Sequence, residues 1–160
     1  MVMEKHVEIK YREVASTGEL ERDEALLLER AIEACSGSYA PYSHFNVGAA
    51  VMLENGEIFS ASNQENAAYP SGLCAERSTL FYAHSKFPDV PVTALAVAAK
   101  CNGELTKDPT YPCGACRQVL YESQMRGKRR IKVIVGSASK IQVIDSCDLL
   151  PFAFDNLPEI

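Results

Sequence analysis

The sequence predicts a single mixed α/β domain in which helices pack on the faces of a mixed β-sheet. Helical and extended patterns follow one another in the order α-β-β-α-β-α-β-β. Residues 92–99 form an uninterrupted run of small apolar side chains, which is typical of a strand buried on both faces. Asn55-Gly56 separates two extended segments and indicates a hairpin. We therefore expect a sheet of five strands.

Three helices are expected from the apolar spacing and the stop signals. Residues 20–35 repeat apolar side chains at a near-helical period, and acidic residues crowd the first turn, where the helix dipole favours them. A second helix runs from residue 74 to about 86, before Pro88, and a third from 113 to about 125. Alternation in residues 7–11 suits a short strand or an ordered arm. The strands are expected at residues 47–53, 57–61, 92–99, 131–135 and 141–144.

Length, charge and composition exclude several classes of protein. A chain of 160 residues is typical of one domain, and we find no repeat or linker that divides it. The net charge of −5 argues against broad nucleic-acid binding. No stretch approaches the roughly 18 uncharged apolar residues of a membrane span. Charged residues interrupt the N-terminal segment, so no secretion signal is expected. The six cysteines are then expected to be reduced thiols of a cytoplasmic protein.

Three cysteines have the spacing of metal ligands. Cys113 and Cys116 form a C-x-x-C pair at the start of a predicted helix, and Cys74 stands at the start of another. No fourth ligand has a matching spacing, and a catalytic zinc keeps its fourth position for water. Glu76 lies two residues beyond Cys74, where a carboxylate can take a proton from water at the metal. The spacing therefore predicts a catalytic Zn²⁺ site.

Each of these residues also has a simpler interpretation. Cys113 and Cys116 could be a redox pair or two buried thiols, and Glu76 could be a solvent-facing glutamate. Arg77 and Arg117 each follow a ligand and could place a cation beside a thiolate, or could form surface ion pairs.

A polar cluster follows the second predicted strand. Asn63 and Glu65 would point the same way on an extended segment. An amide beside a carboxylate suits the vicinal hydroxyl groups of a sugar. On spacing alone, a polar turn is the better interpretation of these residues.

The order of the motifs resembles that of the small cytidine deaminases, members of the zinc-dependent cytidine and deoxycytidylate deaminase superfamily. The resemblance covers residues 22–155. It rests on Tyr42-Ser43-x-Phe45-x-Val47-Gly48-Ala49-Ala50, Asn63-x-Glu65-Asn66-Ala67, Cys74-Ala75-Glu76-Arg77, Pro112-Cys113-Gly114-Ala115-Cys116-Arg117-Gln118-Val119 and Leu149-Leu150-Pro151-x-x-Phe154.

The resemblance implies a fold, a reaction and a division of the chain. The fold would be a three-layer α/β/α sandwich with a five-stranded mixed sheet. Residues 21–160 would form the deaminase domain, with residues 1–20 as an N-terminal extension. The enzyme would be a hydrolase acting on the amidine C–N bond of a cyclic base. It would convert cytidine and 2′-deoxycytidine to uridine and 2′-deoxyuridine plus ammonia, as in pyrimidine salvage.

The same resemblance assigns roles to individual residues. One zinc per subunit would be bound by Cys74, Cys113 and Cys116, with Glu76 as the proton shuttle. The substrate would contact Phe45, Asn63, Glu65, the Ala75 backbone and Phe154. Phe154 would reach a neighbouring subunit, because such enzymes are homotetramers with shared active sites.

The chain departs from the family pattern at Ser62, where a cysteine is common, and at Tyr111, where a small residue is usual. The rival interpretations are a blasticidin-type deaminase, a polynucleotide editor and a non-catalytic zinc-stabilised interaction module. Asn63 and Glu65 favour a nucleoside substrate over the first two, and Glu76 speaks against the third.

Overall fold

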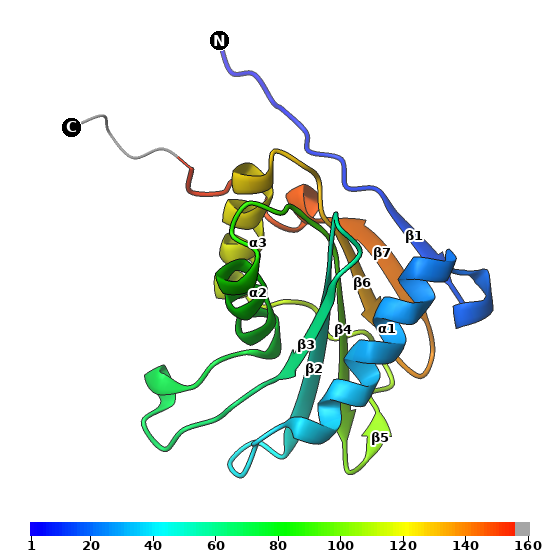
Figure 1. Cartoon of the computed structure of the whole chain (residues 1–160). Helices are drawn as coiled ribbons and strands as arrows, with labels where there is room; N and C mark the ends of the chain where they lie inside the picture. Colours follow the sequence, from blue (N-terminus) through cyan, green and yellow to red (C-terminus); the bar gives the residue numbers. More distant parts are fainter. Residues whose placement is uncertain (156–160) are drawn as a thin grey trace.

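A mixed β-sheet runs through the centre of the protein, which a computed structural model describes over residues 1–155 (Figure 1). The strand order is β1-β7-β6-β4-β2-β3, and β5 pairs with β4 beside this path. Strands β4 and β6 are parallel, whereas the other pairs are antiparallel. The strands are β1 (Tyr11–Val14), β2 (Phe45–Leu53), β3 (Ile58–Ser62), β4 (Val92–Cys101), β5 (Glu104–Leu105), β6 (Lys132–Gly136) and β7 (Ile141–Asp145).

Helices cover both faces of this sheet. Figure 1 shows α1 on one face, and α2 and α3 side by side on the other. The predicted mixed fold of three layers is therefore confirmed. The helices are α1 (Arg22–Ala34), α2 (Ala75–Lys86) and α3 (Gly114–Gly127), with 3₁₀ turns at Thr17–Glu19, Cys35–Gly37, Tyr69–Ser71 and Ser146–Leu149.

The sheet has two more strands than predicted. The five expected strands correspond to β2, β3, β4, β6 and β7. Strand β1 comes from the segment that suited either a strand or an arm. Strand β5 lies in a segment that reads as a polar loop, and it folds back on β4 through Asn102-Gly103. Both of these turn residues have positive φ (53° and 84°), as a tight hairpin of this type requires.

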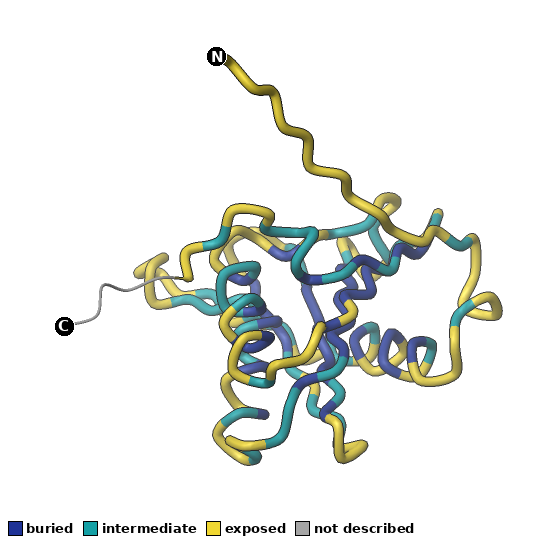
Figure 2. The backbone as a smooth tube through the Cα atoms, turned by 90° about the horizontal axis from the view of Figure 1, so that it is seen from above, coloured by how far each residue is buried: buried dark blue, intermediate teal, exposed yellow. Residues whose placement is uncertain are grey.

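The two faces of the sheet bury separate apolar clusters. Leu27, Leu28 and Ala31 of α1 pack on one face, and Leu80 of α2 and Leu120 of α3 pack on the other. Figure 2 shows the buried backbone concentrated in the sheet and in the helix turns that face it, whereas the first ten residues are exposed.

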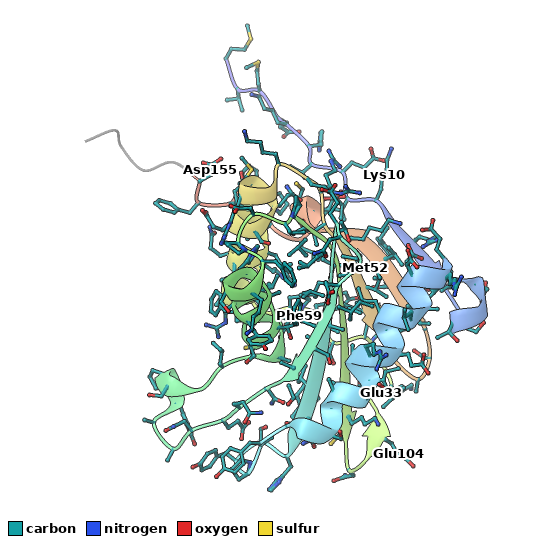
Figure 3. All side chains as sticks on the ribbon, in the orientation of Figure 1. Lys10, Glu33, Met52, Phe59, Glu104 and Asp155 are labelled. Carbon is teal, nitrogen blue, oxygen red and sulfur yellow. The ribbon has the colours of Figure 1, made fainter. Side chains whose placement is uncertain are left out.

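Strands β2 and β3 each contribute side chains to both faces of the sheet, as two residues labelled in Figure 3 illustrate. Met52 of β2 packs against the α1 cluster, whereas Phe59 of β3 packs against the α2 side. The Phe59 ring meets that of Tyr82 edge-on, with the centroids 5.4 Å apart. Within residues 1–155, no helix is long and apolar enough to span a bilayer.

A buried carboxylate joins three parts of the fold. Glu24 of α1 is only 3% exposed. It accepts hydrogen bonds from Arg12 of β1, from Lys132 of β6 (3.1 Å) and from the Glu21 backbone (3.1 Å). Burial by itself would raise the pKa of Glu24, but the hydrogen bonds from Lys132, the Glu21 backbone and Arg12 outweigh it, so the pKa lies below that of an ordinary glutamate.

We expect Glu24→Gln to lower the free energy of unfolding near neutral pH by about 1–3 kcal/mol, since both cationic partners are partly solvated. A carboxylate whose pKa is lowered by folding stabilises the protein above its unfolded pKa. That contribution disappears as the pH falls through the folded pKa. Urea unfolding of both proteins between about pH 7 and pH 3 should therefore show the difference shrinking as acid is added.

Glu29→Gln on the same helix is the matched control, because Glu29 is exposed. It should follow the wild type throughout. A Glu24→Gln deficit that stayed constant down to pH 3 would mean that the charge of Glu24 is not what stabilises this contact.

Candidate metal centre and adjoining cavity

Two helix N-termini bring the three predicted thiols together. Cys74 is the N-cap of α2 and Cys113 is the N-cap of α3, and both have extended backbone angles. Cys116 follows in the first turn of α3 and is fully buried. Unpaired backbone N–H groups and the positive end of the helix dipole occur at these positions. Each helix therefore presents its thiols where a negative charge is stabilised.

The sulfur positions fit a tetrahedral zinc ion. The Sγ atoms of Cys74 and Cys113 are 3.8 Å apart, and those of Cys113 and Cys116 are 3.5 Å apart. All three lie within 4.8 Å of one another. Zn–S bonds of about 2.3 Å in a tetrahedron place neighbouring sulfurs about 3.8 Å apart. Within residues 1–155, these cysteines form the one group of three or more histidine, cysteine, aspartate or glutamate side chains that lie close enough together to hold a metal ion.

The charges in the cluster favour a thiolate at Cys74. A hydrogen bond from the Cys116 thiol, with another from Arg77, lowers the pKa of Cys74 to about 5 against the opposing effect of burial. Arg77 Nη2 lies 3.6 Å from Cys74 Sγ, which is the position expected for a supporting cation. The hydrogen bond to Cys74, together with burial, raises the pKa of Cys116.

Glu76 is buried in the first turn of α2, with 4% of its surface exposed. Burial raises the pKa of Glu76 to about 7, and the negative charge of Cys74 adds to this effect. Hydrogen bonds from its own backbone N–H and from the Cys116 thiol act in the other direction. The interpretation of Glu76 as a solvent-facing glutamate is therefore wrong. A carboxyl group with a pKa near neutrality can both accept and donate a proton.

A cavity of about 490 Å³ opens beside the thiols. This volume is in the range of small-molecule sites. Cys74 and Arg77 contribute to its wall on the metal side, and Asn63 and Glu65 contribute from the segment after β3. The remaining lining residues are Tyr42, Ser43, Gln64, Asn66, Tyr69, Gly72 and Leu73.

Asn63 and Glu65 are held in place by different parts of the chain. Asn63 Oδ1 accepts hydrogen bonds from the Ser38 hydroxyl (2.5 Å) and the Val47 backbone (2.9 Å), while its Nδ2 donates to the Phe45 carbonyl (2.9 Å). One Nδ2 hydrogen is then left for a ligand. The Asn63 side chain is therefore fixed before any ligand binds.

Glu65 clamps the turn that precedes β2. Its Oε2 accepts from the backbone N–H groups of Tyr42 (3.0 Å) and Ser43 (3.2 Å), and its Oε1 accepts from the Ser43 hydroxyl. These bonds, with that from the Ser43 hydroxyl first, lower the pKa of Glu65. His44, which follows Ser43 in this turn, has a φ of 55°, which is unusual for a residue other than glycine.

Seven residues that line the cavity were not predicted as site residues, among them Tyr42, Ser43 and Tyr69. Tyr42 and Tyr69 meet edge-on with ring centroids 5.9 Å apart, and Ser43 bonds to Glu65. Tyr42 and Ser43 belong to one of the motifs on which the family resemblance rests, so that motif could have identified them as residues of the cavity. Tyr69 follows the polar cluster by only a few residues and lies in an exposed 3₁₀ turn.

Other predicted site residues lie outside the cavity wall. Phe45 is half-buried against the α2-side core, and Ala75 is fully buried at the first position of α2. Phe154 is 66% exposed in the C-terminal tail, where its backbone bonds to Gln118. Arg117 donates to the carbonyls of Pro112 (2.8 Å) and Leu149 (3.1 Å) rather than to a thiolate.

Comparison with known proteins gives a consistent result. Residues 21–133 match the zinc-binding region of cytidine and deoxycytidylate deaminases. A cytidine deaminase of Halalkalibacterium halodurans is 43% identical over 133 residues, which cover 82% of this chain and 94% of that protein. A cytidine deaminase of Mycobacterium tuberculosis is 38% identical over 97 residues, covering 61% of this chain and 68% of that protein.

Solved structures agree with the sequence relatives. The cytidine deaminase of Burkholderia pseudomallei superposes with a TM-score of 0.69 at 37% identity, covering 84% of this chain and all of that one. That of Mycobacterium tuberculosis gives 0.68 at 33% identity, covering 85% and 100%. With the family match extending over more than half of the chain and the three thiols meeting at two helix N-termini, this protein belongs to the cytidine and deoxycytidylate deaminase family.

Proposed function

We propose that this protein hydrolytically deaminates cytidine and 2′-deoxycytidine, giving uridine and 2′-deoxyuridine plus ammonia. The observation that carries the proposal is the buried Glu76 carboxyl group beside the three thiols. One of these thiols, that of Cys74, belongs to a residue that lines the adjoining cavity. The relatives that bear the name cytidine deaminase support this choice of substrate. The reaction is one of pyrimidine salvage.

The chain's own residues supply the binding and the proton transfers. Cys74, Cys113 and Cys116 would hold one Zn²⁺ per subunit. The ion would supply a Lewis acid that lowers the pKa of water at the site. Glu76 accepts a proton from the water that attacks C4 of the base. It passes this proton to N3, takes a second proton from the hydroxyl group now attached to C4, and gives it to the amino group. The C4–N bond then breaks to release ammonia as the C4 carbonyl forms, so that one water molecule is consumed for each ammonia released.

Asn63 and Glu65 bind the sugar in this proposal. The free Nδ2 hydrogen of Asn63 donates a hydrogen bond to a hydroxyl oxygen, and Glu65 accepts a hydrogen bond from a hydroxyl group at its remaining lone pair. The Phe45 ring packs against the nucleoside, and the Ala75 backbone contacts the base. Arg77 stabilises the Cys74 thiolate.

Phe154 contributes to the site of a neighbouring subunit in a homotetramer. Its exposure in the tail, outside the cavity of its own chain, supports a contact of this kind. The deaminase domain spans residues 21–160, of which the last five lie outside the described residues, and residues 1–20 form an N-terminal extension. A cytoplasmic location would keep the thiols reduced, and all six cysteines are free in the described residues.

Mixing the purified protein with cytidine and following the loss of absorbance at the cytosine band tests the activity directly. We expect conversion to uridine that stops after chelation and returns with added zinc. Stoichiometric zinc without conversion of cytidine or 2′-deoxycytidine would leave the metal centre in place and overturn the substrate.

The sugar contacts predict a strong preference for the nucleoside over the free base. Cytosine lacks the hydroxyl groups that Asn63 and Glu65 bind, and binding energy from a non-reacting part of a substrate lowers the barrier at the reacting centre. We expect kcat/KM for cytosine to be lower than for cytidine by about 10²-fold or more. Measuring both substrates with one enzyme preparation checks this, and equal values would contradict the sugar role.

A further inference from the structure

Strand β1 belongs to the domain's sheet but precedes the residues that match the family, which begin at residue 21. It pairs antiparallel with β7 at the edge of the sheet, and Glu13 lies opposite Gln142. Most of β1 is exposed, so burial of apolar surface does not account for it. Its side chains make specific polar contacts instead.

Those contacts form a chain of hydrogen bonds that leads to the metal centre. Glu13 Oε2 accepts from Gln142 Nε2 at 2.7 Å, and Gln142 Oε1 accepts from the Tyr111 hydroxyl. Gln142 is only 5% exposed. Its amide has one possible orientation here, because a carboxylate can only accept and the phenol donates the second bond. We call Glu13, Gln142 and Tyr111 the β1 relay.

The β1 relay ends two residues before a predicted zinc ligand. Tyr111 is joined through the buried Pro112 to Cys113, the N-cap of α3. Arg117 Nε donates a hydrogen bond to the carbonyl oxygen of Pro112 (2.8 Å). The segment that carries Cys113 is therefore fixed by α3 at one point and by the sheet edge, through Tyr111, at another. Cys113 is itself exposed, so it lacks the packing that holds Cys116.

We propose that β1 is a positioning element of the metal centre, with Glu13 acting through Gln142 and Tyr111 to hold Cys113 in its ligand position. The proposal rests on the zinc site proposed above. Hydrogen bonds behind the ligands of a metal commonly change its affinity 10–100-fold when they are removed. The relay gives the first 20 residues a role in the chemistry of a site far from them in sequence.

The test measures how fast zinc leaves the native enzyme in excess chelator, followed by the absorbance of the chelator complex. Tyr111→Phe and Glu13→Ala each break the relay at one end, and each should speed zinc release by about 10-fold. The double variant should release zinc no faster than the faster single variant, because both changes break the same chain. Cobalt-substituted protein should show an altered ligand-field spectrum in the same variants.

Two matched variants separate the relay from general loosening. Glu13→Gln keeps an acceptor oxygen for Gln142 and should restore slow release. Tyr11→Phe removes a hydroxyl from the same strand, and within residues 1–155 that hydroxyl makes no hydrogen bond to a side chain or backbone group. Release from Tyr11→Phe should match the wild type.

Wild-type release rates in Tyr111→Phe and Glu13→Ala, with zinc bound normally by the wild type, would overturn the relay alone. Multiplying effects in the double variant would overturn it as well, since they would show independent contributions. A wild-type chain that bound no zinc would overturn the metal centre and the relay together.

Discussion

Glu76→Gln should retain one zinc per chain and lose about 10²–10⁴-fold in kcat, the range usual for a positioned acid or base. Glutamine has nearly the same shape as glutamate and can occupy the same buried position, but it cannot take up a proton from water or return one to N3 and the leaving amine. The three thiols remain in place, because Glu76 is not among them. Zinc content and steady-state turnover of cytidine, measured on the same samples, check both parts.

Glu57→Gln is a suitable control, since Glu57 is exposed beside the β2–β3 turn and should leave kcat unchanged. A Glu76→Gln enzyme within a few-fold of wild type would remove Glu76 from the proton transfers. Loss of zinc together with activity would instead make Glu76 a support of the metal centre.

The metal centre was predictable because its signals are local. The C-x-x-C spacing and the Cys-Ala-Glu motif each lie at a helix start, and helix starts can be recognised from a few adjacent residues. The hairpin at Asn55-Gly56 is equally local, and Gly56 has the positive φ (87°) that this turn requires. Asn102-Gly103 carries the same sequence signal and also forms a hairpin turn, although both of its residues have positive φ, whereas in the first turn only Gly56 does. It escaped prediction because the residues around it are polar rather than alternating.

The contacts that complete the site could not be predicted in the same way. Glu65 binds backbone groups 22 and 23 residues earlier, and Glu13 meets Gln142 across 129 residues. Such partners meet only after the sheet has formed, because the register of β7 with β1 decides which side chains are adjacent. The sequence therefore indicated which residues have useful chemistry, but not which of them hold one another in place.

The packing of α1 on the sheet depends on one glycine, and this gives the second large effect that we expect. Gly48 lies in β2 beneath the C-terminal end of α1. A Cβ atom at this position would come within 2.0 Å of the Ala31 carbonyl oxygen and 2.6 Å of the Cys35 nitrogen. Both are backbone atoms, so neither can move aside unless the helix itself shifts. We expect Gly48→Ala to lower the free energy of unfolding by about 3 kcal/mol or more, the upper end of overpacking effects, as measured by urea unfolding.

Alanine substitutions at two further glycines should have smaller effects, because the added methyl group would meet fewer or more mobile atoms. At Gly136 it would approach the Leu28 side chain to 2.6 Å, and a side chain can turn away, so Gly136→Ala should cost about 1–3 kcal/mol. At Gly18 the nearest atom is 3.7 Å away, so Gly18→Ala should be close to neutral. A decreasing order of stability other than Gly18→Ala, Gly136→Ala, Gly48→Ala would contradict the close approach of α1 to β2.

Movement of β2 away from α1 should also weaken nucleoside binding in the Gly48→Ala protein that does fold. The N–H of the adjacent Val47 in β2 donates a hydrogen bond to Asn63 Oδ1 (2.9 Å), so it helps to position the Asn63 side chain. A raised KM for cytidine in that variant would connect the packing of the helix to the geometry of the sugar site.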